Sequence, residues 1–114
     1  MFVYIAGKIA DETEEKVQEN IRKAGVVARE LTLLGHSTHV PHWNGLWHME
    51  TVSRLDLSHS QWIEIDKVAI SHCDGIVMML NWRDSIGAVM EHAYAKVINT
   101  KIYYEPNYPP KDEK

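Results

Sequence analysis

The sequence predicts a single-domain α/β protein, in which helices flank an open parallel sheet of four or five strands in the order 2-1-3-4, of the Rossmann-like or flavodoxin-like class. Short apolar runs rich in β-branched residues alternate with longer helical patterns along the chain. Strands that alternate with helices imply parallel pairing with right-handed crossovers. With 45% hydrophobic residues, the 114-residue chain can bury one core without disulfides or a structural metal.

The first two elements have clear local signals. Phe2–Ala6 is a short apolar run ended by Gly7, which predicts a buried strand followed by a tight turn. A long helix follows, for which Asp11 and Glu14 have the spacing of a capping box and Gly35 suits the C-terminal end. Its expected buried face recurs at spacings of three and four residues: Val17, Ile21, Ala24, Ala28 and Leu31.

The second half of the chain continues the alternation. The expected elements are a strand at residues 37–41, a helix from Ser58 or Ser60 to about His72, a buried strand at 75–80, a helix at 85–97 and a last strand at 101–104. We assign residues 1–105 to the domain. Residues 106–114 contain prolines that cannot continue a strand, so we assign them to a C-terminal tail.

Composition excludes several functional classes. The formal net charge is -4 and Lys and Arg are not clustered, so no nucleic-acid polymer is expected as a partner. Cys73 is the only cysteine, which rules out an intramolecular disulfide, and the first residues resemble a strand rather than a leader. No apolar run approaches the ~20 residues needed to span a bilayer. We expect a cytoplasmic protein with no membrane partner and no cofactor.

Two loops are expected to frame a binding site. In an open parallel sheet, ligands bind beyond the carboxyl ends of the strands where the strand order reverses, here between the first and third strands. The loops at residues 7–11 and 81–85 both lead into helix N-termini, which favour anions. Gly7 allows close approach of a ligand, Lys8 adds a cation, and Ser85 can cap the helix and donate a hydroxyl. Each of them alone is more often only a turn or cap residue.

Two carboxylates occupy positions where apolar residues are expected. Glu91 lies on a helix that is apolar nearly all round, and Asp66 lies in an apolar band of the preceding helix. An ionised group left unpaired in an apolar setting costs much free energy, so a purely structural role is disfavoured. Paired acids flanking a cleft suit glycosidic chemistry, in which one attacks the anomeric carbon and the other handles protons or sugar hydroxyls.

Three blocks of the chain carry a family resemblance. They are Tyr4-Ile5-Ala6-Gly7, Asp66 followed eight residues later by Asp74, and Ser85-x-Gly87-x-x-x-Glu91-x-x-x-Ala95. In this order and spacing, the chain resembles the nucleoside 2-deoxyribosyltransferase superfamily, which includes N-glycosidases of 2′-deoxynucleoside 5′-monophosphates. The resemblance implies cleavage or transfer at the N-glycosidic bond of a nucleoside or its 5′-monophosphate.

The resemblance also implies roles for individual residues. Glu91 is the expected nucleophile, Tyr4 orients it, and Asp66 contacts the sugar or assists proton transfer to the base. Ser85 and Gly87 face the 5′ end of the ligand. Their spacing is closer to the monophosphate glycosidases, which tilts the expected substrate toward nucleotides.

Other positions depart from those glycosidases. Lys8-Ile9-Ala10 does not reproduce their phosphate loop, and His92 replaces the usual aliphatic residue. Pro41-His42, Trp47-His48 and Asn81-Trp82 resemble instead a poorly characterised bacterial and phage branch. We therefore expect His42, Trp47, His48 and Trp82 to contact the ligand, with the tryptophans available to stack on a base. A role of these tryptophans in the core or in a subunit interface is the alternative.

A metal site is not expected. His36, His39 and His42 cannot all face one ion from a regular strand, and no cysteine or carboxylate completes a metal motif. Cys73 has no catalytic motif around it.

Two functional alternatives keep the fold without the chemistry: a non-catalytic nucleotide-binding or sensing module, and a subunit whose main role is assembly. The apolar helices and aromatic C-terminal residues predict a homodimer or larger assembly. The long connection at residues 43–59 is expected to form a partial lid over the pocket.

Overall fold

The protein is a three-layer α/β domain in the computed structural model, which describes residues 1–43 and 58–112. Within this part of the chain, four parallel strands form one sheet in the order β2-β1-β3-β4. The strands are β1 (Phe2–Ala6), β2 (Ser37–His39), β3 (Gly75–Met78) and β4 (Lys101–Tyr104). The predicted fold class and strand order are therefore confirmed.

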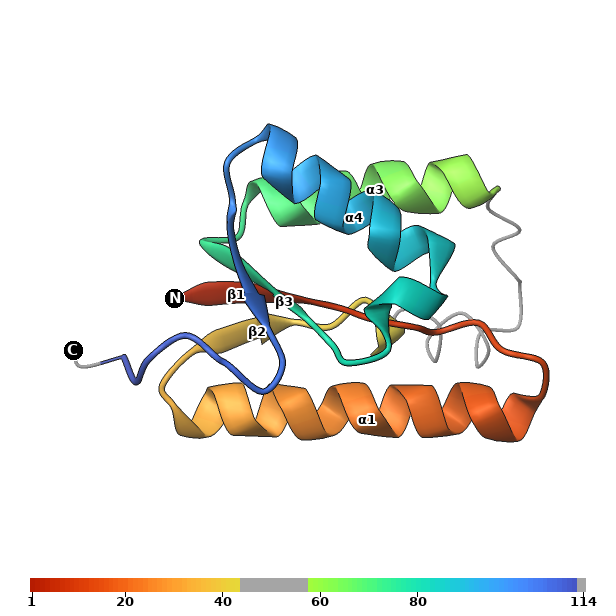
Figure 1. Cartoon of the computed structure of the whole chain (residues 1–114), viewed down its shortest axis with the longest axis horizontal. Coiled ribbons are helices and arrows are strands. Elements are labelled where there is room, and N and C mark those ends of the chain that lie inside the picture. Colours follow the sequence, from red (N-terminus) through yellow and green to blue (C-terminus); the bar gives the residue numbers. More distant parts are fainter. Residues whose placement is uncertain (44–57, 113–114) are drawn as a thin grey trace.

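The helices divide between the two faces of the sheet. Helix α1 (Glu14–Leu33) covers one face, while α3 (His59–Ser71) and α4 (Ile86–Val97) lie together over the other (Figure 1). A short turn, η1 (Trp82–Asp84), joins β3 to α4. None of the helices described here has the length and hydropathy needed to cross a membrane.

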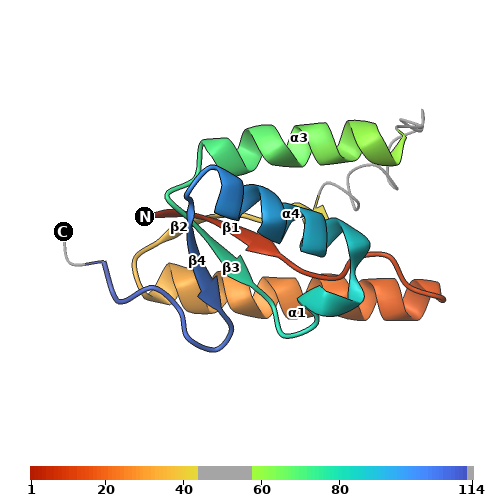
Figure 2. The ribbon, with the colours of Figure 1, turned by 45° about the horizontal axis from the view of Figure 1, so that its top comes forward.

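The two central strands fix the position of the site. β1 pairs with β2 from Phe2↔Ser37 and with β3 from Val3↔Gly75, so the reversal of strand order falls between β1 and β3. Both strands are almost completely buried, because helices cover both faces of the sheet. The turned view in Figure 2 shows the loops after β1 and β3 leaving from the same edge of the sheet.

The N-terminal end of α1 differs from the predicted capping box. Thr13 is the N-cap, and its side-chain oxygen accepts a hydrogen bond from the Lys16 amide at 3.2 Å. The Asp11 carboxylate instead accepts from the Glu12 amide and from Asn20. Asp11 therefore connects the preceding loop to α1 through Asn20, and Thr13 caps the helix in its place.

The other helix ends agree with the sequence. Gly35 has a φ of 87° and ends α1, a conformation that glycine adopts at little cost. Ser58 caps α3 in a reciprocal capping box with Gln61, and Ser85 caps α4 through the Ala88 amide. β2 and β3 are each two residues shorter than predicted, because the chain turns at Pro41 and at Leu80.

Two apolar clusters fill the spaces above and below the sheet. The cluster under α1 consists of Val3, Ile5, Ala24, Val27, Ala28, Leu31, Val40, Val77 and Met79. The cluster under α3 and α4 consists of Tyr4, Ala6, Ile70, Ile76, Met78, Ala88 and Ala95. Alternate residues of β1 thus point to opposite faces, and Tyr4 points toward α4.

The segment assigned to a C-terminal tail packs against the domain as far as residue 112. Pro109 is fully buried, and Tyr108 contacts the cluster under α1. The Asp112 carboxylate lies 2.9 Å from the Met1 amino group, and the His36 side chain donates to the Pro110 carbonyl at 2.8 Å. Like the predicted tail, the segment has no regular helix or strand.

Candidate active site

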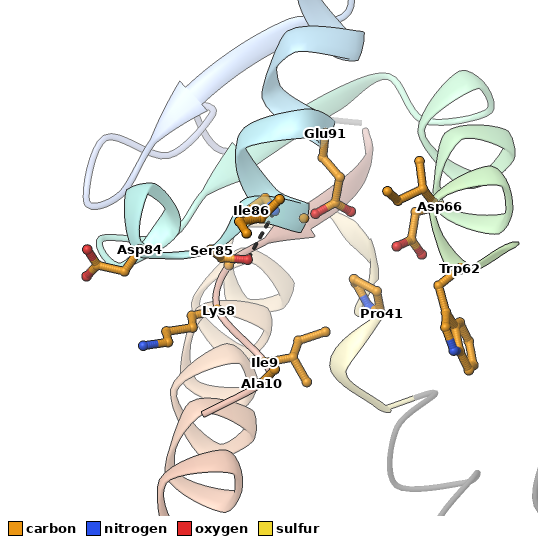
Figure 3. A pocket seen from close by; sticks show the side chains of 14 residues that line it. Lys8, Ile9, Ala10, Pro41, Trp62, Asp66, Asp84, Ser85, Ile86 and Glu91 are labelled. Atoms are coloured by element: carbon orange, nitrogen blue, oxygen red, sulfur yellow. Dashed lines mark hydrogen bonds between the residues drawn. The ribbon is translucent and has the colours of Figure 1, made fainter. Parts of the chain in front are cut away.

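A pocket of about 590 Å³ opens at the carboxyl edge of the sheet, where the strand order reverses (Figure 3). This volume is typical of small-molecule sites. Its walls come from the loop after β1 and from the helices on one face of the sheet. The lining residues are Gly7, Lys8, Ile9, Ala10, Pro41, Trp62, Ile63, Asp66, Asp84, Ser85, Ile86, Gly87, Ala88 and Glu91.

Glu91 lies on the inward face of α4, between the buried Ala88 and Ala95. Its side chain lines the pocket although the residue is only 8% exposed. The Tyr4 hydroxyl donates a hydrogen bond to Glu91 Oε2. Burial raises the pKa of Glu91 to about 8, with the Tyr4 bond acting against the rise and the charge of Asp66 adding to it. Glu91 is therefore largely protonated at neutral pH.

Asp66 approaches the same pocket from α3. Burial raises its pKa to about 6, and its interaction with the Tyr4 hydroxyl opposes the rise. Figure 3 shows the Asp66 and Glu91 carboxyl groups at the same end of the pocket. Two acids with raised pKa values in one pocket mark a candidate site for proton transfer.

Tyr4 connects the two acids. It is completely buried in β1, and its ring stacks on His39 with ring centroids 5.4 Å apart. Burial raises the pKa of Tyr4 far above its usual value, and the neighbouring charges of Glu91 and Asp66 add to the rise. The hydroxyl therefore stays protonated and serves as a donor. The structure brings together the predicted trio of Tyr4, Asp66 and Glu91 from three separate elements.

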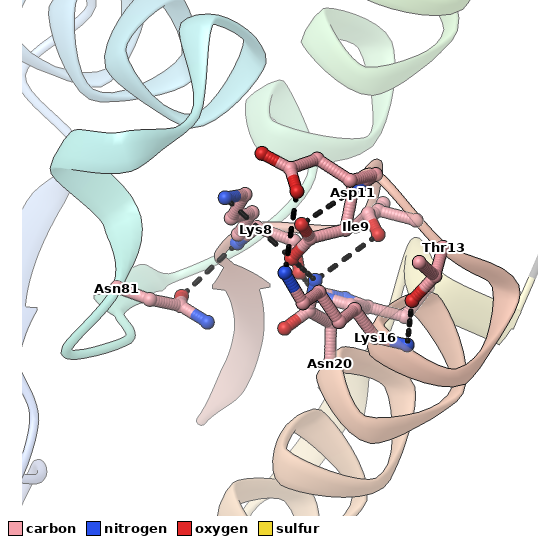
Figure 4. Close-up of polar contacts among 9 residues, drawn as sticks. Lys8, Ile9, Asp11, Thr13, Lys16, Asn20 and Asn81 are labelled. Atoms are coloured by element: carbon pink, nitrogen blue, oxygen red, sulfur yellow. Dashed lines mark hydrogen bonds and ion pairs between the residues drawn. The ribbon is translucent and has the colours of Figure 1, made fainter.

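Polar contacts fix the loop after β1, and one of them is an ion pair that balances the positive charge of Lys8 (Figure 4). The Lys8 amide donates to the Asn81 side chain at 3.0 Å, and Lys8 Nζ lies 3.5 Å from an Asp11 carboxylate oxygen. The buried Asn20 side chain donates to the Ile9 carbonyl and to Asp11. Hydrogen bonds to Glu12 and Asn20, together with Lys8, hold the pKa of Asp11 below its usual value, so its charge persists beside Lys8.

The two glycines of the site differ in what surrounds them. A Cβ at Gly7 would lie 2.4 Å from Met79 Sδ and 2.9 Å from Met79 Cβ, so packing of the strand end requires this glycine. A Cβ at Gly87 would meet only Ser85 Oγ, at 3.8 Å. Gly87 lines the pocket, and its missing side chain leaves space there rather than relieving a clash within the protein.

We expect Gly87→Ala to stabilise the fold and weaken ligand binding. Alanine at a helical glycine raises the free energy of unfolding by roughly 0.5 to 1 kcal/mol, while the new methyl group occupies pocket volume and lowers the affinity for a small molecule bound in the pocket by about tenfold. Urea unfolding and calorimetric titration measure the two effects. Gly25→Ala on α1 is the matched control, because a Cβ added at Gly25 would meet no other atom within 4 Å. It should stabilise without changing affinity. Unchanged affinity in Gly87→Ala would contradict the role of Gly87.

Some residues expected at the site lie elsewhere. His42 is fully buried, and its Nε2 donates to the Lys8 carbonyl at 3.2 Å, so it supports the loop from beneath. Burial lowers the pKa of His42 to about 4, and its Nδ1 has no partner among the described residues. Trp82 stacks on His92 at 4.3 Å between ring centroids and is not among the lining residues. Trp47, His48 and most of the expected lid lie outside the described residues.

Other lining residues were not predicted as site residues. Trp62 and Ile63 precede Asp66 by four and three residues, so their position on the same face of α3 was available from the sequence. Ile9, Ala10 and Ile86 line the pocket with apolar side chains, for which the sequence carries no motif. Among residues 1–43 and 58–112, no three His, Cys, Asp or Glu side chains converge as a metal-ligand set.

Comparisons with known proteins agree with this architecture. A family model described as a domain of unknown function (DUF4406) matches residues 1–104. A solved structure of the 2-deoxyribosyltransferase from the psychrotolerant bacterium Bacillus psychrosaccharolyticus, a biocatalyst for nucleoside synthesis, superposes with a TM-score of 0.63 at 18% identity. The match covers 91% of this chain and 71% of that one, and at this identity it establishes a shared fold. No curated protein sequence matches.

Proposed function

We propose that this protein, which belongs to the DUF4406 family, breaks the N-glycosidic bond of a nucleoside by attack of Glu91 on the anomeric carbon. The observation that carries the proposal is the environment of Glu91. This carboxyl group is buried, lines a pocket of suitable size and accepts a hydrogen bond from Tyr4, with a second acid beside it. Burying an acid destabilises a fold, so such a cluster in a pocket favours a chemical role.

The trio can divide the work of a retaining glycosyl transfer. Glu91 first loses its proton to solvent. One of its oxygens then forms a bond to C1′ as the bond between C1′ and the base nitrogen breaks, and the electron pair of that bond leaves with the base. Asp66, which holds a proton more tightly than an ordinary aspartate, hydrogen-bonds a sugar hydroxyl or supplies the proton that the leaving base needs. Attack of water on the glycosyl ester gives hydrolysis, and attack of a second base gives transfer.

Tyr4 positions the nucleophile in this scheme. Its hydroxyl holds Glu91 Oε2, which leaves Oε1 to face the ligand. A donor at one carboxyl oxygen also stabilises the charged form, and this opposes the effect of burial on the pKa. Positive charge that develops on the sugar in the transition state stabilises the carboxylate further.

The charges of the pocket favour a substrate without a phosphate group. Figure 3 shows Lys8 and Asp84 at the end of the pocket away from Asp66. The charge of Lys8 is balanced by Asp11, and Asp84 adds a carboxylate to the same wall. The Ser85 hydroxyl accepts from the Ala88 amide, which leaves its proton free to donate to either kind of ligand. A neutral 5′-hydroxyl suits this end better than a phosphate dianion, so we propose the nucleoside over the nucleotide that the sequence favours.

We therefore expect a 2′-deoxynucleoside to bind more tightly than its 5′-monophosphate. Asp84→Asn should reduce the ratio of the two dissociation constants by about fivefold. Removing one nearby surface charge changes the interaction by roughly 1 kcal/mol. Calorimetric titration of both ligands at fixed ionic strength measures the change. Glu64→Gln is the control. It removes one negative charge, as Asp84→Asn does, but at an exposed position on α3, and it should leave this ratio of dissociation constants unchanged. Tighter binding of the monophosphate to the unmodified protein would reverse the substrate assignment.

The reaction itself is tested by incubating the full chain with nucleosides and their monophosphates, with and without an acceptor base. Chromatography of released free base separates the proposed enzyme from its two alternatives. Release of base without acceptor supports hydrolysis, and base exchange only with acceptor supports transfer. Nucleoside binding without release would make the protein a sensing module, and no binding at all would leave an assembly role.

A further inference from the structure

Three aromatic rings, those of Trp82, His92 and Tyr104, meet beside the pocket without lining it. The Trp82 and His92 rings stack, with their centroids 4.3 Å apart and an angle of 29° between their planes. His92 Nε2 lies 2.7 Å from the Tyr104 hydroxyl, within hydrogen-bond distance. The three residues come from η1, α4 and β4, so the cluster joins the turn to a helix and to the sheet.

The cluster holds a turn that has little stability of its own. η1 is a single 3₁₀ turn of three residues. The Asp84 amide donates to the Asn81 carbonyl at 3.1 Å, and the Ser85 amide donates to the Trp82 carbonyl at 3.2 Å. Bonds of this type have poorer geometry than those of an α-helix. Because Trp82 also packs against the apolar cluster under α3 and α4, its side chain holds η1 in place, and the two neighbouring rings fix the direction of that side chain.

The charges around His92 favour its neutral form. Burial lowers the pKa of His92, and the positive charges of Lys96 on α4 and Arg83 on η1 lower it further. The Arg83 guanidinium carbon lies 5.2 Å from the centroid of the Trp82 ring, so this cation contacts the cluster as well. At neutral pH, His92 therefore stacks on Trp82 as an uncharged ring.

The segment that the cluster holds supports two walls of the pocket. Residues 84–87, at the end of η1 and the start of α4, line the pocket. Asn81, which precedes η1, does not cap the turn with its side chain. Its Oδ1 instead accepts a hydrogen bond from the Lys8 amide at 3.0 Å and so holds the loop after β1, which forms another wall (Figure 4). A shift of η1 would therefore be felt on both sides of the ligand.

We propose that Trp82, His92 and Tyr104 form an aromatic brace that positions these two walls for the ligand. His92 follows the nucleophile Glu91 directly in sequence, but its ring points toward Tyr104 rather than into the pocket. The brace acts on binding more than on bond cleavage, because η1 supports the end of the pocket away from Asp66 (Figure 3). Walls that are already in place lower the cost of ordering the site when the ligand binds. The identity of the ligand, a nucleoside, rests on the proposed function; the brace itself does not.

Amide hydrogen exchange of the unliganded full chain tests the brace directly. His92→Ala removes both the stack and the hydrogen bond, so the Asp84 and Ser85 amides should exchange at least about tenfold faster as η1 opens. The Lys8 amide should also exchange faster, because Asn81 holds it. His92→Phe restores an aromatic ring and should return these exchange rates to within about threefold of those in the unmodified protein.

The same variants separate positioning from chemistry. With the best nucleoside from the screen, His92→Ala should raise KM about tenfold and change kcat less than about twofold, because it displaces a wall and not the nucleophile. His72→Ala is the matched control: it removes an exposed imidazole at the C-terminal end of α3 and should leave exchange and KM unchanged. Tyr104→Phe removes a single hydroxyl and should shift both measurements in the same direction by less. It decides the question if circular dichroism shows that His92→Ala does not fold.

Three results would overturn the brace. The first is unchanged exchange of the Asp84 and Ser85 amides in His92→Ala. The second is faster exchange confined to η1, with the Lys8 amide and KM unchanged, which would leave the cluster a local structural role. The third is a loss of kcat at constant KM, which would place the effect on the chemical step. If the unmodified protein binds no nucleoside, the proposed function fails, and exchange of the Lys8 amide alone decides whether the brace positions both walls.

Discussion

Glu91→Gln is expected to lower the rate of free-base release by at least about a thousandfold while leaving the protein folded. Glutamine keeps the shape of the side chain and can still accept the Tyr4 hydrogen bond, but its amide cannot form the glycosyl ester. Initial rates of base release, measured with the best substrate from the screen, give the effect. Glu64→Gln makes the same chemical change on the exposed surface of α3 and should retain full activity.

Two further measurements distinguish a nucleophile from a residue that only binds. A 2-fluoro nucleoside analogue should leave a covalent glycosyl adduct on the peptide that contains Glu91, detectable by mass spectrometry. The rate with the unmodified protein should rise with pH toward about 8 if Asp66 only contacts the sugar, because the attacking carboxylate must lose the proton that burial holds on it. If Asp66 supplies the proton to the base, the rate should instead be greatest between about 6 and 8. Full activity of Glu91→Gln, or an adduct on another residue, would exclude Glu91 as the nucleophile.

Much of the fold was accessible from the sequence because local and long-range signals agree. The continuous apolar run at Gly75–Met78 predicts a strand buried on both faces, and such a strand has to be central in a parallel sheet. Ser85 was correctly predicted as the cap of α4. Glu91 was accessible for the opposite reason: an acid among small and apolar neighbours conflicts with local packing, and conflicts of this kind concentrate at functional sites.

The sequence did not reveal which of several similar side chains makes a given hydrogen bond. Asp11 and Thr13 can both cap α1, and the selection of Thr13 follows from the contact of Asp11 with Asn20, nine residues along the helix. The same contact places Asp11 beside Lys8. Lys8, which we expected to contribute a positive charge for an anionic ligand, therefore forms an ion pair with Asp11. His42 was expected to face the ligand, but the turn after β2 directs it beneath the loop. Side-chain direction in a loop has no periodicity from which it can be predicted.

The buried acids also determine how stability depends on pH. The folded pKa of Glu91, about 8, lies above its ordinary value of 4.5, so the folded protein binds more protons than the unfolded chain between these pH values. The contribution of Glu91 to stability is therefore greatest below its ordinary pKa and is lost as pH rises toward 8. The loss approaches about 1.4 kcal/mol per pH unit within this window. Asp66 adds a smaller loss, between 3.8 and about 6. His42 contributes in the opposite direction between about 4 and 6.5, because burial lowers its folded pKa to about 4.

Glu91→Gln should accordingly be more stable than the unmodified protein by about 3 kcal/mol at pH 7, and equally stable near pH 4. The side-chain amide of the glutamine is neutral at every pH. Folding of the variant therefore requires neither that a carboxyl group be protonated nor that its negative charge be buried. Urea unfolding between pH 4 and 8 should show this difference growing with pH. Glu91→Gln combined with Asp66→Asn should leave a stability that rises with pH up to about 6.5, because His42 still titrates. Glu64→Gln should follow the unmodified protein throughout. A difference that stays constant with pH would show that Glu91 is not held in its neutral form, and a destabilised Glu91→Gln would show that its charge supports the fold. A variant that gains stability as it loses turnover would show that the buried carboxyl group of Glu91 serves activity at a cost in stability.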